Sequence, residues 1–508
     1  MTVAEGSRRS ARHVLGMDLG TSSLKCVVLD ESGAVLASAS RSYPTQSPHP
    51  GWAEQDPADW LIALKAAIAD LRAQSDDLID RVAAVGVCSA AHIPVLLDAE
   101  DRVLRPAILW SDQRSSAEVA ALRAEHGALL ETTALNEAGC TWTLPQLLWV
   151  WNHEPDVLPR VSGFLSSKDY LVSRLTGERI MDHGSAAATL MLDAQHRQWS
   201  ADILKLSRLP DSAVPPLASP TDIVGHITSE AAVAFGLPAG IPVVAGTLDS
   251  AAEMLGCGVL ASGEAGMVRV GSAGGVMAVT DRAAFHHGVI TYPHVIGDRF
   301  YKQAGTNACA TSLKWIRDLG QALPGADATA FTYETMDRLA ADVAPGAEGL
   351  MFHPYLQGER APHWNADVRG SFTGLDLRHG WPHMVRAVME GVAFSLRDGL
   401  AMFERDELGM TSAVMSGGVV RSPVWTQIIT DVLGMETRTI RHGDSALGAA
   451  MLAAIGAGLF QDVAHAVSVC VVPEATQRPV TENTERYAAL FGRYRRVGSF
   501  LVELAESR

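Results

Sequence analysis

The stretch HVLGMDLGTSSLKCVVLD, residues 13–30, contains the pattern that decides the fold of the first half of the chain. An apolar run ends at Asp18, a polar turn with Gly20 follows, and apolar residues resume at Leu24, which predicts two strands joined by a tight turn. An aspartate at such a strand end can hold a hydrated Mg²⁺, while the hydroxyl and N–H groups of the turn can hold phosphate oxygens. An ordinary capped hairpin turn has the same composition, so the motif alone leaves both interpretations open.

The residues that follow extend this start into an α/β pattern. Residues 30–33, DESG, predict a turn, and residues 34–39 predict a third strand. Residues 57–74 carry apolar side chains at helical spacing, with Asp56 as the expected N-cap. Residues 82–88, VAAVGVC, are typical of a buried strand. Strand, hairpin, helix and strand therefore follow one another in the order of an α/β domain.

Two further glycine-bearing turns follow predicted strands later in the chain. Residues 271–275, GSAGG, come after the strand 267–270, and residues 416–418, SGG, come after the strand 413–415. Each turn is a weak signal by itself. Three turns of this kind predict a nucleotide held between two lobes, without a G-x-x-x-x-G-K-[ST] loop or a G-x-G-x-x-G fingerprint. The pattern is compatible with duplication of one α/β unit, and it places the domain boundary near residue 254.

Length and charge restrict the class of protein. The 508 residues are enough for two to four domains, and a hydrophobic content of 47% excludes a disordered chain. Asp and Glu number 57 against 41 Lys and Arg, so the net charge of −16 opposes binding to nucleic acid or to anionic membrane surfaces. A phosphorylated small ligand remains compatible with this charge because backbone N–H groups and a bound cation can hold phosphate.

Two segments bear on location in the cell. Residues 1–13 are polar and basic and lack the apolar stretch of a secretory signal, so we expect a flexible N-terminal tail. Residues 444–460, DSALGAAMLAAIGAGLF, are shorter than the roughly 18 apolar residues of a membrane span and predict a tightly packed buried helix. The expected location is the cytoplasm.

Several segments resemble the FGGY carbohydrate kinase family of the hexokinase/actin-like ATPase superfamily, and within it the xylulose kinases. The resemblance covers residues 14–500 and is carried by GMDLGTSSLKCVVLDESGAVLASAS, HPGWAEQDPADW, VLRPAILWSDQRS, SSKDYLVSRLTGE, AGTLDSAAEMLGCGV, YLQGERAPHWNADVRGSFTGLDLRHG and VMSGGVVRSPVWTQIITDVLG. It implies two RNase H-like α/β domains with a catalytic cleft between them. Residues 14–254 are then the N-terminal domain, which binds sugar, phosphate and Mg²⁺, and residues 255–508 the C-terminal domain, which binds the nucleotide.

The resemblance also implies roles for single residues. Asp249 corresponds to the catalytic base. Asp18 corresponds to the aspartate that holds Mg²⁺ through a water molecule, and it is also expected among the catalytic residues. The residues expected to bind ATP are Gly20, Thr21, Ser22, Lys25, Gly271, Ser272, Gly417, Gly418 and Ser422. Threonine is more usual in the family at the position of Ser272, and Lys25 has the alternative interpretation of a solvated strand residue.

The sugar-binding segments depart from the family pattern. The chain has Ser89-Ala90-Ala91-His92 where xylulose kinases usually have Gly-Gln-Met-His, and Thr247-Leu248 where Gly-Gly commonly precedes the catalytic aspartate. These changes put D-xylulose itself in doubt as the substrate. The residues expected to line the sugar site are Ala91, His92, Trp110, Asp112, Arg114 and Asp249. The alternatives are a core histidine for His92, core packing for Trp110 and a structural ion pair for Asp112 with Arg114.

The expected activity is transfer of the γ-phosphoryl group of ATP, with Mg²⁺ as cofactor, to a primary hydroxyl of a small ketose. D-Xylulose, giving D-xylulose 5-phosphate, is the first expected substrate, and ribulose, erythrulose, a pentitol or a tetritol are the alternatives. A non-catalytic sugar or nucleotide sensor and an actin-like or chaperone-like ATPase are the competing classes. The expected partner is the sugar, with neither nucleic acid nor membrane, and related kinases suggest a homodimer.

Overall fold

The computed structural model describes residues 12–75, 77–324, 331–404 and 409–507, which form two compact units. Of these described residues, the first unit comprises those up to Gly258 together with Tyr292–Asp298 and His442–Val472, and the second unit comprises the others. Residues 442–472, which the sequence prediction assigned to the second domain, thus lie in the first unit. Most of the predicted N-terminal tail lies outside the described residues, and His13 is already the first residue of a strand.

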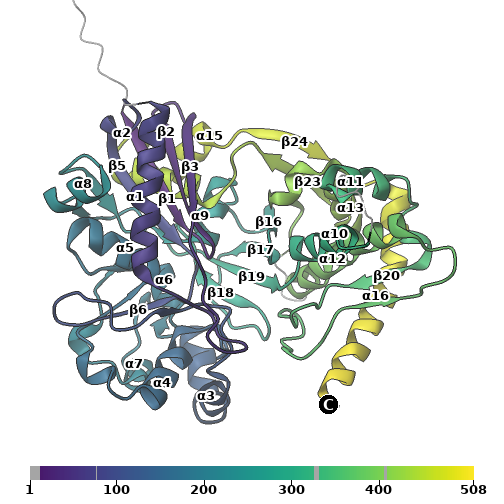
Figure 1. Ribbon diagram of the computed structural model, residues 1–508, viewed down its shortest axis with the longest axis horizontal. Coiled ribbons are helices and arrows are strands. Elements are labelled where there is room, and N and C mark those ends of the chain that lie inside the picture. Colours follow the sequence, from purple (N-terminus) through teal and green to yellow (C-terminus); the bar gives the residue numbers. More distant parts are fainter. Residues whose placement is uncertain (1–11, 76, 325–330, 405–408, 508) are drawn as a thin grey trace, which may run out of the picture. The chain divides into compact units, whose positions relative to one another are not determined.

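The first unit is built on a mixed sheet (Figure 1). Its strand order is β13 (Ile223–His226), β14 (Pro242–Val244), β5 (Val82–Ser89), β1 (His13–Leu19), β2 (Ser23–Asp30) and β3 (Val35–Ser42), and β15 (Thr247–Leu248) also pairs with β5. Strand β1 is antiparallel to β2 and parallel to β5, and β5 is in turn parallel to β14 and β15. The hairpin and the buried strand predicted around Asp18 are confirmed.

The second unit repeats this order of strands. Its sheet runs β18 (Ile290–Pro293, of which Ile290 and Thr291 belong to this unit), β19 (Phe300–Thr306), β17 (Gly274–Thr280), β16 (Ala265–Val270), β22 (Ser412–Gly417), β23 (Glu436–Ile440) and β24 (Pro473–Gln477). Strand β16 is antiparallel to β17 and parallel to β22, and β22 is parallel to β23, as β1, β2, β5 and β14 are in the first unit. The shared order supports the interpretation that one α/β unit was duplicated.

Helices and short strands complete the two units. The helices of the first unit are α1 (Pro57–Gln74), α2 (Asp77–Asp80), α3 (Ser116–Leu129), α4 (Thr143–His153), α5 (Ser167–Thr176), α6 (His183–Ala187), α7 (Ala201–Ser207), α8 (Ser229–Phe235), α9 (Asp249–Gly256), α14 (Ser445–Gly456) and α15 (Val463–Cys470). Those of the second are α10 (Ala310–Gln321), α11 (Tyr333–Ala341), α12 (Trp381–Glu404), α13 (Pro423–Leu433) and α16 (Thr481–Glu506). Two-stranded pairs are β4 (Glu54–Gln55) with β7 (Ala107–Ile108), β6 (Pro94–Leu97) with β8 (Gly163–Ser166), β9 (Met181–Asp182) with β12 (Leu217–Ala218), β10 (Leu192–Asp193) with β11 (Gln198–Trp199), and β20 (Met351–His353) with β21 (Ser371–Thr373).

Helix α1 forms where its pattern predicts. The Asp56 side chain accepts a hydrogen bond from the Ala58 N–H at 2.9 Å and caps the helix, and Pro57 occupies the first turn. Trp60, Leu64 and Ile68 on the apolar face are buried in the core of the first unit. Among the described residues, no helix combines the length and hydrophobicity that a membrane crossing requires.

Helix α14 packs directly against the sheet of the first unit because glycines allow a close approach. A Cβ atom on Gly16 of β1 would lie 2.0 Å from the Ala446 carbonyl oxygen, and one on Gly448 would lie 1.8 Å from that of Ala252. The small side chains of the apolar 444–460 segment are therefore buried, as predicted. This contact brings the N-terminal end of α14 to the strand end that carries Asp18.

Candidate active site

Three neighbouring strands of the first unit end beside one another with polar residues. Asp18 of β1 is in register with Cys88 of the parallel strand β5, and Cys88 is in register with Thr247 of β15. Asp249 is the first residue of α9, directly after β15, and its side chain is half-buried. The carboxyl ends of parallel strands meet at one edge of a sheet, so the fold places Asp18 and Asp249 at the same edge.

The Asp18 carboxylate lies at the start of α14. The Ser445 hydroxyl donates to Asp18 Oδ2 at 2.5 Å, and Cys88 Sγ lies 3.7 Å from Asp18 Oδ1. Burial raises the pKa of the Cys88 thiol well above its usual value, and the negative charges of Asp18, Asp249 and Asp444 raise it further. Three carboxylates thus act on one buried thiol, and oxygen ligands of this kind fit Mg²⁺. Within the described ranges, no three His, Cys, Asp or Glu side chains form a metal-binding group.

Lys25 is paired rather than simply solvated. Its ammonium group forms an ion pair with Asp444, whose other carboxylate oxygen caps α14 by accepting from the Leu447 N–H at 2.9 Å. The Lys25 side chain is 38% exposed. Lys25 of β2 is in register with Asp18 of β1, so its ammonium group lies at the same strand end as the Asp18 carboxylate.

Side chains from other segments form hydrogen bonds to the turn between β1 and β2, and Ser22 of the turn is exposed to solvent. Trp110 Nε1 donates to Thr21 Oγ1 at 3.0 Å, Gln55 Nε2 donates to the Thr21 carbonyl at 2.7 Å, and the Tyr43 hydroxyl donates to the Gly20 carbonyl. Trp110 thus supports the turn instead of serving only as core packing.

His92 lies in a small pocket beside the strand that leads to Asp249. Its Nδ1 is 2.7 Å from the Ala188 carbonyl, so it donates there, and its Nε2 accepts from the Tyr292 hydroxyl at 2.7 Å. The His92 ring also meets Trp142 edge-on, with ring centres 4.6 Å apart. The pocket has a volume of about 10 Å³, room for about one water, and Ala91 and Leu248 are among its walls. His92 is hydrogen-bonded within the protein, as expected of a core histidine, and it also lines a pocket, as expected of a sugar-binding residue.

Asp112 and Arg114 form a buried ion pair. Arg114 Nε and Nη2 donate to the two Asp112 oxygens at 2.9 and 2.7 Å, and Nη1 donates to Glu54 at 2.6 Å. The guanidinium lies 3.7 Å from the centre of the Trp52 ring, and the side chains of both partners are 1% exposed. This geometry favours the structural ion pair that the sequence left open.

Replacement of Arg114 by methionine is therefore expected to lower the free energy of unfolding by ~3–5 kcal/mol, because the Asp112 carboxylate would be buried without its cation. Urea unfolding measures the effect. Arg102→Met is the matched control, since the Arg102 side chain is 72% exposed, and it should leave the urea midpoint nearly unchanged. A normal midpoint for Arg114→Met together with a raised KM for the sugar would instead assign Arg114 to sugar binding.

The predicted nucleotide turns of the second unit lie at the ends of adjacent parallel strands. Val270 of β16 is in register with Gly417 of β22, so Gly271 and Gly418, the next residues, share one edge of the sheet. Gly417 has φ +86°, and a Cβ there would lie 2.5 Å from the Val270 carbonyl, which requires glycine.

The side chains of these turns differ in their exposure. Ser272 and Gly418 are exposed. Ser422 is instead buried: its hydroxyl caps α13 through the Trp425 N–H at 3.0 Å and donates to Asp337 at 2.8 Å. Ser422 thus has a structural role. The solvent-exposed polar groups at this edge of the sheet belong to the glycine turns and to Ser272.

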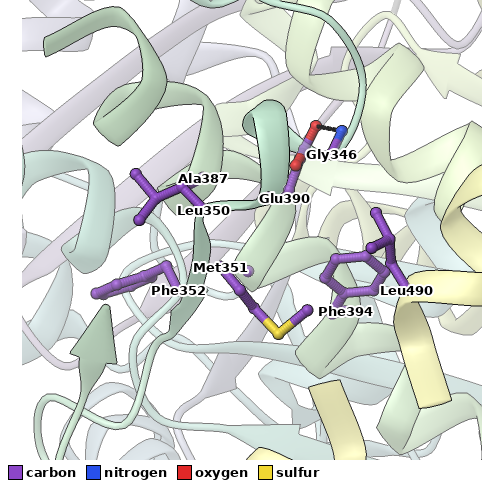
Figure 2. Close-up of a pocket in the computed structure, with 10 residues that line it drawn as sticks. Gly346, Leu350, Met351, Phe352, Ala387, Glu390, Phe394 and Leu490 are labelled. Atoms are coloured by element: carbon purple, nitrogen blue, oxygen red, sulfur yellow. Dashed lines mark hydrogen bonds between the residues drawn. The ribbon is translucent and has the colours of Figure 1, made fainter. Parts of the chain in front are cut away.

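A second small cavity lies within the second unit, under α12 (Figure 2). Its walls are mostly apolar, and its carboxylate, Glu390, accepts from the Gly346 N–H at 2.9 Å and from Arg386 and Tyr487, both at 2.7 Å. A volume of about 10 Å³ is too small for a sugar or a nucleotide. This cavity belongs to the core.

Some residues near the site were not predicted. Asp444 and Ser445 begin the apolar segment at 444–460, whose composition directs attention to packing rather than to its polar first residues. Tyr292 lies 200 residues from its partner His92 in the sequence, and nothing in its neighbourhood marks it. Lys168 lies within the recognised segment SSKDYLVSRLTGE, but only the structure shows that it is buried.

Two family descriptions together cover most of the chain. The N-terminal domain of the FGGY family of carbohydrate kinases matches residues 13–256, and its C-terminal domain matches residues 266–457. The chain belongs to the FGGY family of carbohydrate kinases. It is therefore a sugar kinase, and binding of ATP is general for this family.

Individual relatives agree with this assignment. The chain is 34% identical over 492 residues to the xylulose kinase of Lactococcus lactis, covering 96% of both proteins, and 30% identical over 488 residues to the gluconokinase of Bacillus subtilis, covering 94% of both. The crystal structure of xylulose kinase from Rhodospirillum rubrum superposes with a TM-score of 0.86 at 32% identity, covering 97% of this chain and all of that one. The predicted two-domain kinase fold is confirmed.

Proposed function

We propose that this FGGY kinase transfers the γ-phosphoryl group of ATP to the primary 5-hydroxyl of D-xylulose. The observation that carries the proposal is the near full-length similarity to a xylulose kinase at 34% identity. The edge of the first sheet supports it, because Asp18 and Asp249 lie at the ends of neighbouring strands where phosphate and hydroxyl can meet.

Asp249 is the proposed catalytic base. Its carboxylate accepts the proton of the attacking sugar hydroxyl as the new O–P bond forms and the bond to the ADP oxygen breaks. The Ser250 N–H donates to Asp249 Oδ1 at 2.7 Å, which orients the carboxylate at the first turn of α9. Such a proton transfer contributes roughly 10²–10⁴-fold to the rate.

The phosphate groups are proposed to bind at the turn between β1 and β2. Gly20, Thr21 and Ser22 offer N–H and hydroxyl groups, and Lys25 offers the positive charge. Asp18 would hold Mg²⁺, and the bound cation would neutralise charge on the phosphate oxygens. Gly271, Ser272, Gly417 and Gly418 of the second unit are the residues proposed there for nucleotide binding, and Ser422 caps the helix that follows the last of these turns.

The residues around His92 offer polar groups for a sugar. The pocket there has room for about one water, so it is too small for a whole sugar and can take at most a single hydroxyl group. His92, Ser185 and Thr189 offer hydrogen-bonding groups of the kind that bind hydroxyls. Ala91 lacks the bulk of the methionine usual in xylulose kinases, so ribulose, erythrulose and small polyols are the alternative acceptors.

A screen of ADP release decides the substrate. D-Xylulose, ribulose, erythrulose, pentitols, tetritols and gluconate are compared by kcat/KM, and D-xylulose is expected to lead by at least about 10-fold. A higher kcat/KM for any other acceptor would replace D-xylulose as the substrate and leave the kinase assignment intact.

Replacement of His92 by alanine is expected to raise the KM for the sugar by about 10-fold, the loss of roughly one hydrogen bond, on the hypothesis that a sugar hydroxyl takes the place of the Tyr292 hydroxyl at Nε2. The KM for ATP should stay within about 3-fold of the wild-type value. Tyr292→Phe, which removes only the hydroxyl that donates to His92, separates the effect of the sugar contact from that of ring orientation. If His92→Ala lowers thermal stability without changing the KM for the sugar, His92 is a core histidine only.

A further inference from the structure

A buried ionic cluster lies behind the segment that leads to Asp249. It consists of Lys168, Asp169, Asp182 and Thr247, which we call the Lys168 cluster, and each of these residues is at most 1% exposed. Lys168 and Asp169 lie in the first turn of α5, Asp182 ends β9, and Thr247 begins β15. Buried charges of this kind are costly unless they are fully paired.

The Lys168 ammonium group has an acceptor for each of its N–H bonds. It donates to Asp169 Oδ1, to Asp182 Oδ1 at 2.9 Å and to the Ala245 carbonyl at 2.9 Å. Although burial alone would lower it, the pKa of Lys168 is raised by the two carboxylates. The positive charge of Lys168 also contributes to the lowered pKa of Asp182. The lysine is therefore charged, and one of its three bonds holds the backbone four residues before Asp249.

Asp182 connects this charge to Thr247. The Thr247 hydroxyl donates to Asp182 Oδ2 at 2.9 Å, which also accepts from the Gly184 N–H at 2.8 Å. A Cβ on Gly184 would lie 2.7 Å from Thr247 Oγ1, so the glycine makes room for the hydroxyl. Asp182 Oδ1 accepts from the Ser185 N–H at 3.1 Å. The carboxylate is thus held on both oxygens, and Thr247 is bonded to a fixed group.

The segment 245–248 is restrained along its whole length. Gly246 has φ +69°, a Cβ there would lie 1.7 Å from the Val87 carbonyl, and its N–H donates to the Pro220 carbonyl at 2.9 Å. Thr247 and Leu248 then pair with β5. A restrained strand immediately before α9 fixes the direction in which the helix starts, and with it the position of Asp249.

We propose that the Lys168 cluster positions Asp249 for proton transfer, and that Thr247 is the positioning residue through which it acts. The inference rests on the proposed role of Asp249 as base. Loss of the Thr247 hydroxyl frees the strand from Asp182 and misplaces the Asp249 carboxylate relative to the sugar hydroxyl, an error to which proton transfer is sensitive. The Thr247 hydroxyl is bonded to Asp182 and not to a residue proposed to bind the sugar or the nucleotide, so we expect its loss to act mainly on kcat.

The test compares Thr247→Val, which keeps the shape but lacks the hydroxyl, with Thr247→Ser, which keeps the hydroxyl. Thr247→Val is expected to lower kcat by about 10-fold with both KM values within about 3-fold, and Thr247→Ser to restore kcat to within about 3-fold of wild type. In an Asp249→Asn background, Thr247→Val should have no further effect on the residual rate, because both changes act on one group. Thermal unfolding shows whether each variant is folded. Thr247→Ala replaces Thr247→Val in the test if the valine side chain is too close to Gly184.

The outcomes separate this inference from the proposed function. Wild-type activity in Asp249→Asn would overturn the role of Asp249 and the inference with it. An inactive Asp249→Asn with equal kcat values for Thr247→Val, Thr247→Ser and wild type would overturn the inference alone. An equal fractional loss of rate from Thr247→Val with and without Asp249 would show a general structural role and would also overturn it.

Discussion

Asp249→Asn is expected to lower sugar-dependent ADP release by about 10³-fold, because the amide cannot accept the proton of the attacking hydroxyl. The substitution keeps the size of the side chain at the first position of α9, so the fold should be retained. Nucleotide binding, measured by titration calorimetry, should stay within about 3-fold of wild type, since Asp18 and the β1–β2 turn are unchanged.

Asp202→Asn is the matched control for this prediction. Asp202 is a carboxylate of the same unit at the start of another helix, and its side chain is 73% exposed. Its replacement should leave ADP release unchanged. If Asp249→Asn kept more than about a tenth of the wild-type kcat, another group would have to be the base.

Asp18→Asn is expected to lower kcat by about 10²-fold at a Mg²⁺ concentration that saturates the wild type, and to raise the Mg²⁺ concentration needed for half-maximal rate. The carboxylate supplies the charge that attracts the hydrated cation, and the amide does not. Initial rates over a Mg²⁺ titration at fixed ATP measure both effects.

Ser445→Ala tests whether loss of the hydrogen bond to Asp18, without loss of its charge, is enough to raise the Mg²⁺ requirement. It removes the hydroxyl that donates to Asp18 at 2.5 Å but leaves the carboxylate charge, so the Mg²⁺ requirement should change far less than in Asp18→Asn. An unchanged Mg²⁺ requirement in Asp18→Asn would contradict the role of Asp18 as the residue that holds the cation.

Local patterns predicted the parts of the fold that depend on neighbours in sequence. The β1–β2 hairpin follows from the turn at Gly20, and α1 follows from its apolar spacing and the Asp56 cap, which the structure contains. The buried helix near 444–460 was likewise found. In each case the signal lies within one segment, because propensity, capping and burial pattern agree there.

Contacts between distant segments could not be predicted in this way. The return of 442–472 to the first unit depends on the fit of α14 against Gly16, which no local pattern reveals. The ion pair of Lys25 with Asp444 spans 419 residues. These contacts arise from packing of whole elements, so they appear only when the sheet and helix are placed together.

The candidate site likewise contains residues that the sequence predicts and residues that only the structure reveals. Asp18 and Asp249 follow apolar strands, so their place at strand ends could be predicted from the sequence and the family resemblance. The buried pairing of Arg114 with Asp112 and Glu54, and the bonds of Lys168, involve groups whose burial is invisible in the sequence. The sequence alone does not distinguish a polar residue that binds a ligand from one that forms a buried ion pair in the core.

The fate of the γ-phosphoryl group tests the central claim most directly. In a single turnover with [γ-³²P]ATP, Mg²⁺ and the best acceptor of the screen, the label should appear in a sugar phosphate, at a rate that depends on sugar concentration and falls by about 10³-fold in Asp249→Asn. Label that appears only as inorganic phosphate, at a rate that no sugar changes, would contradict transfer to a sugar and would indicate an ATPase.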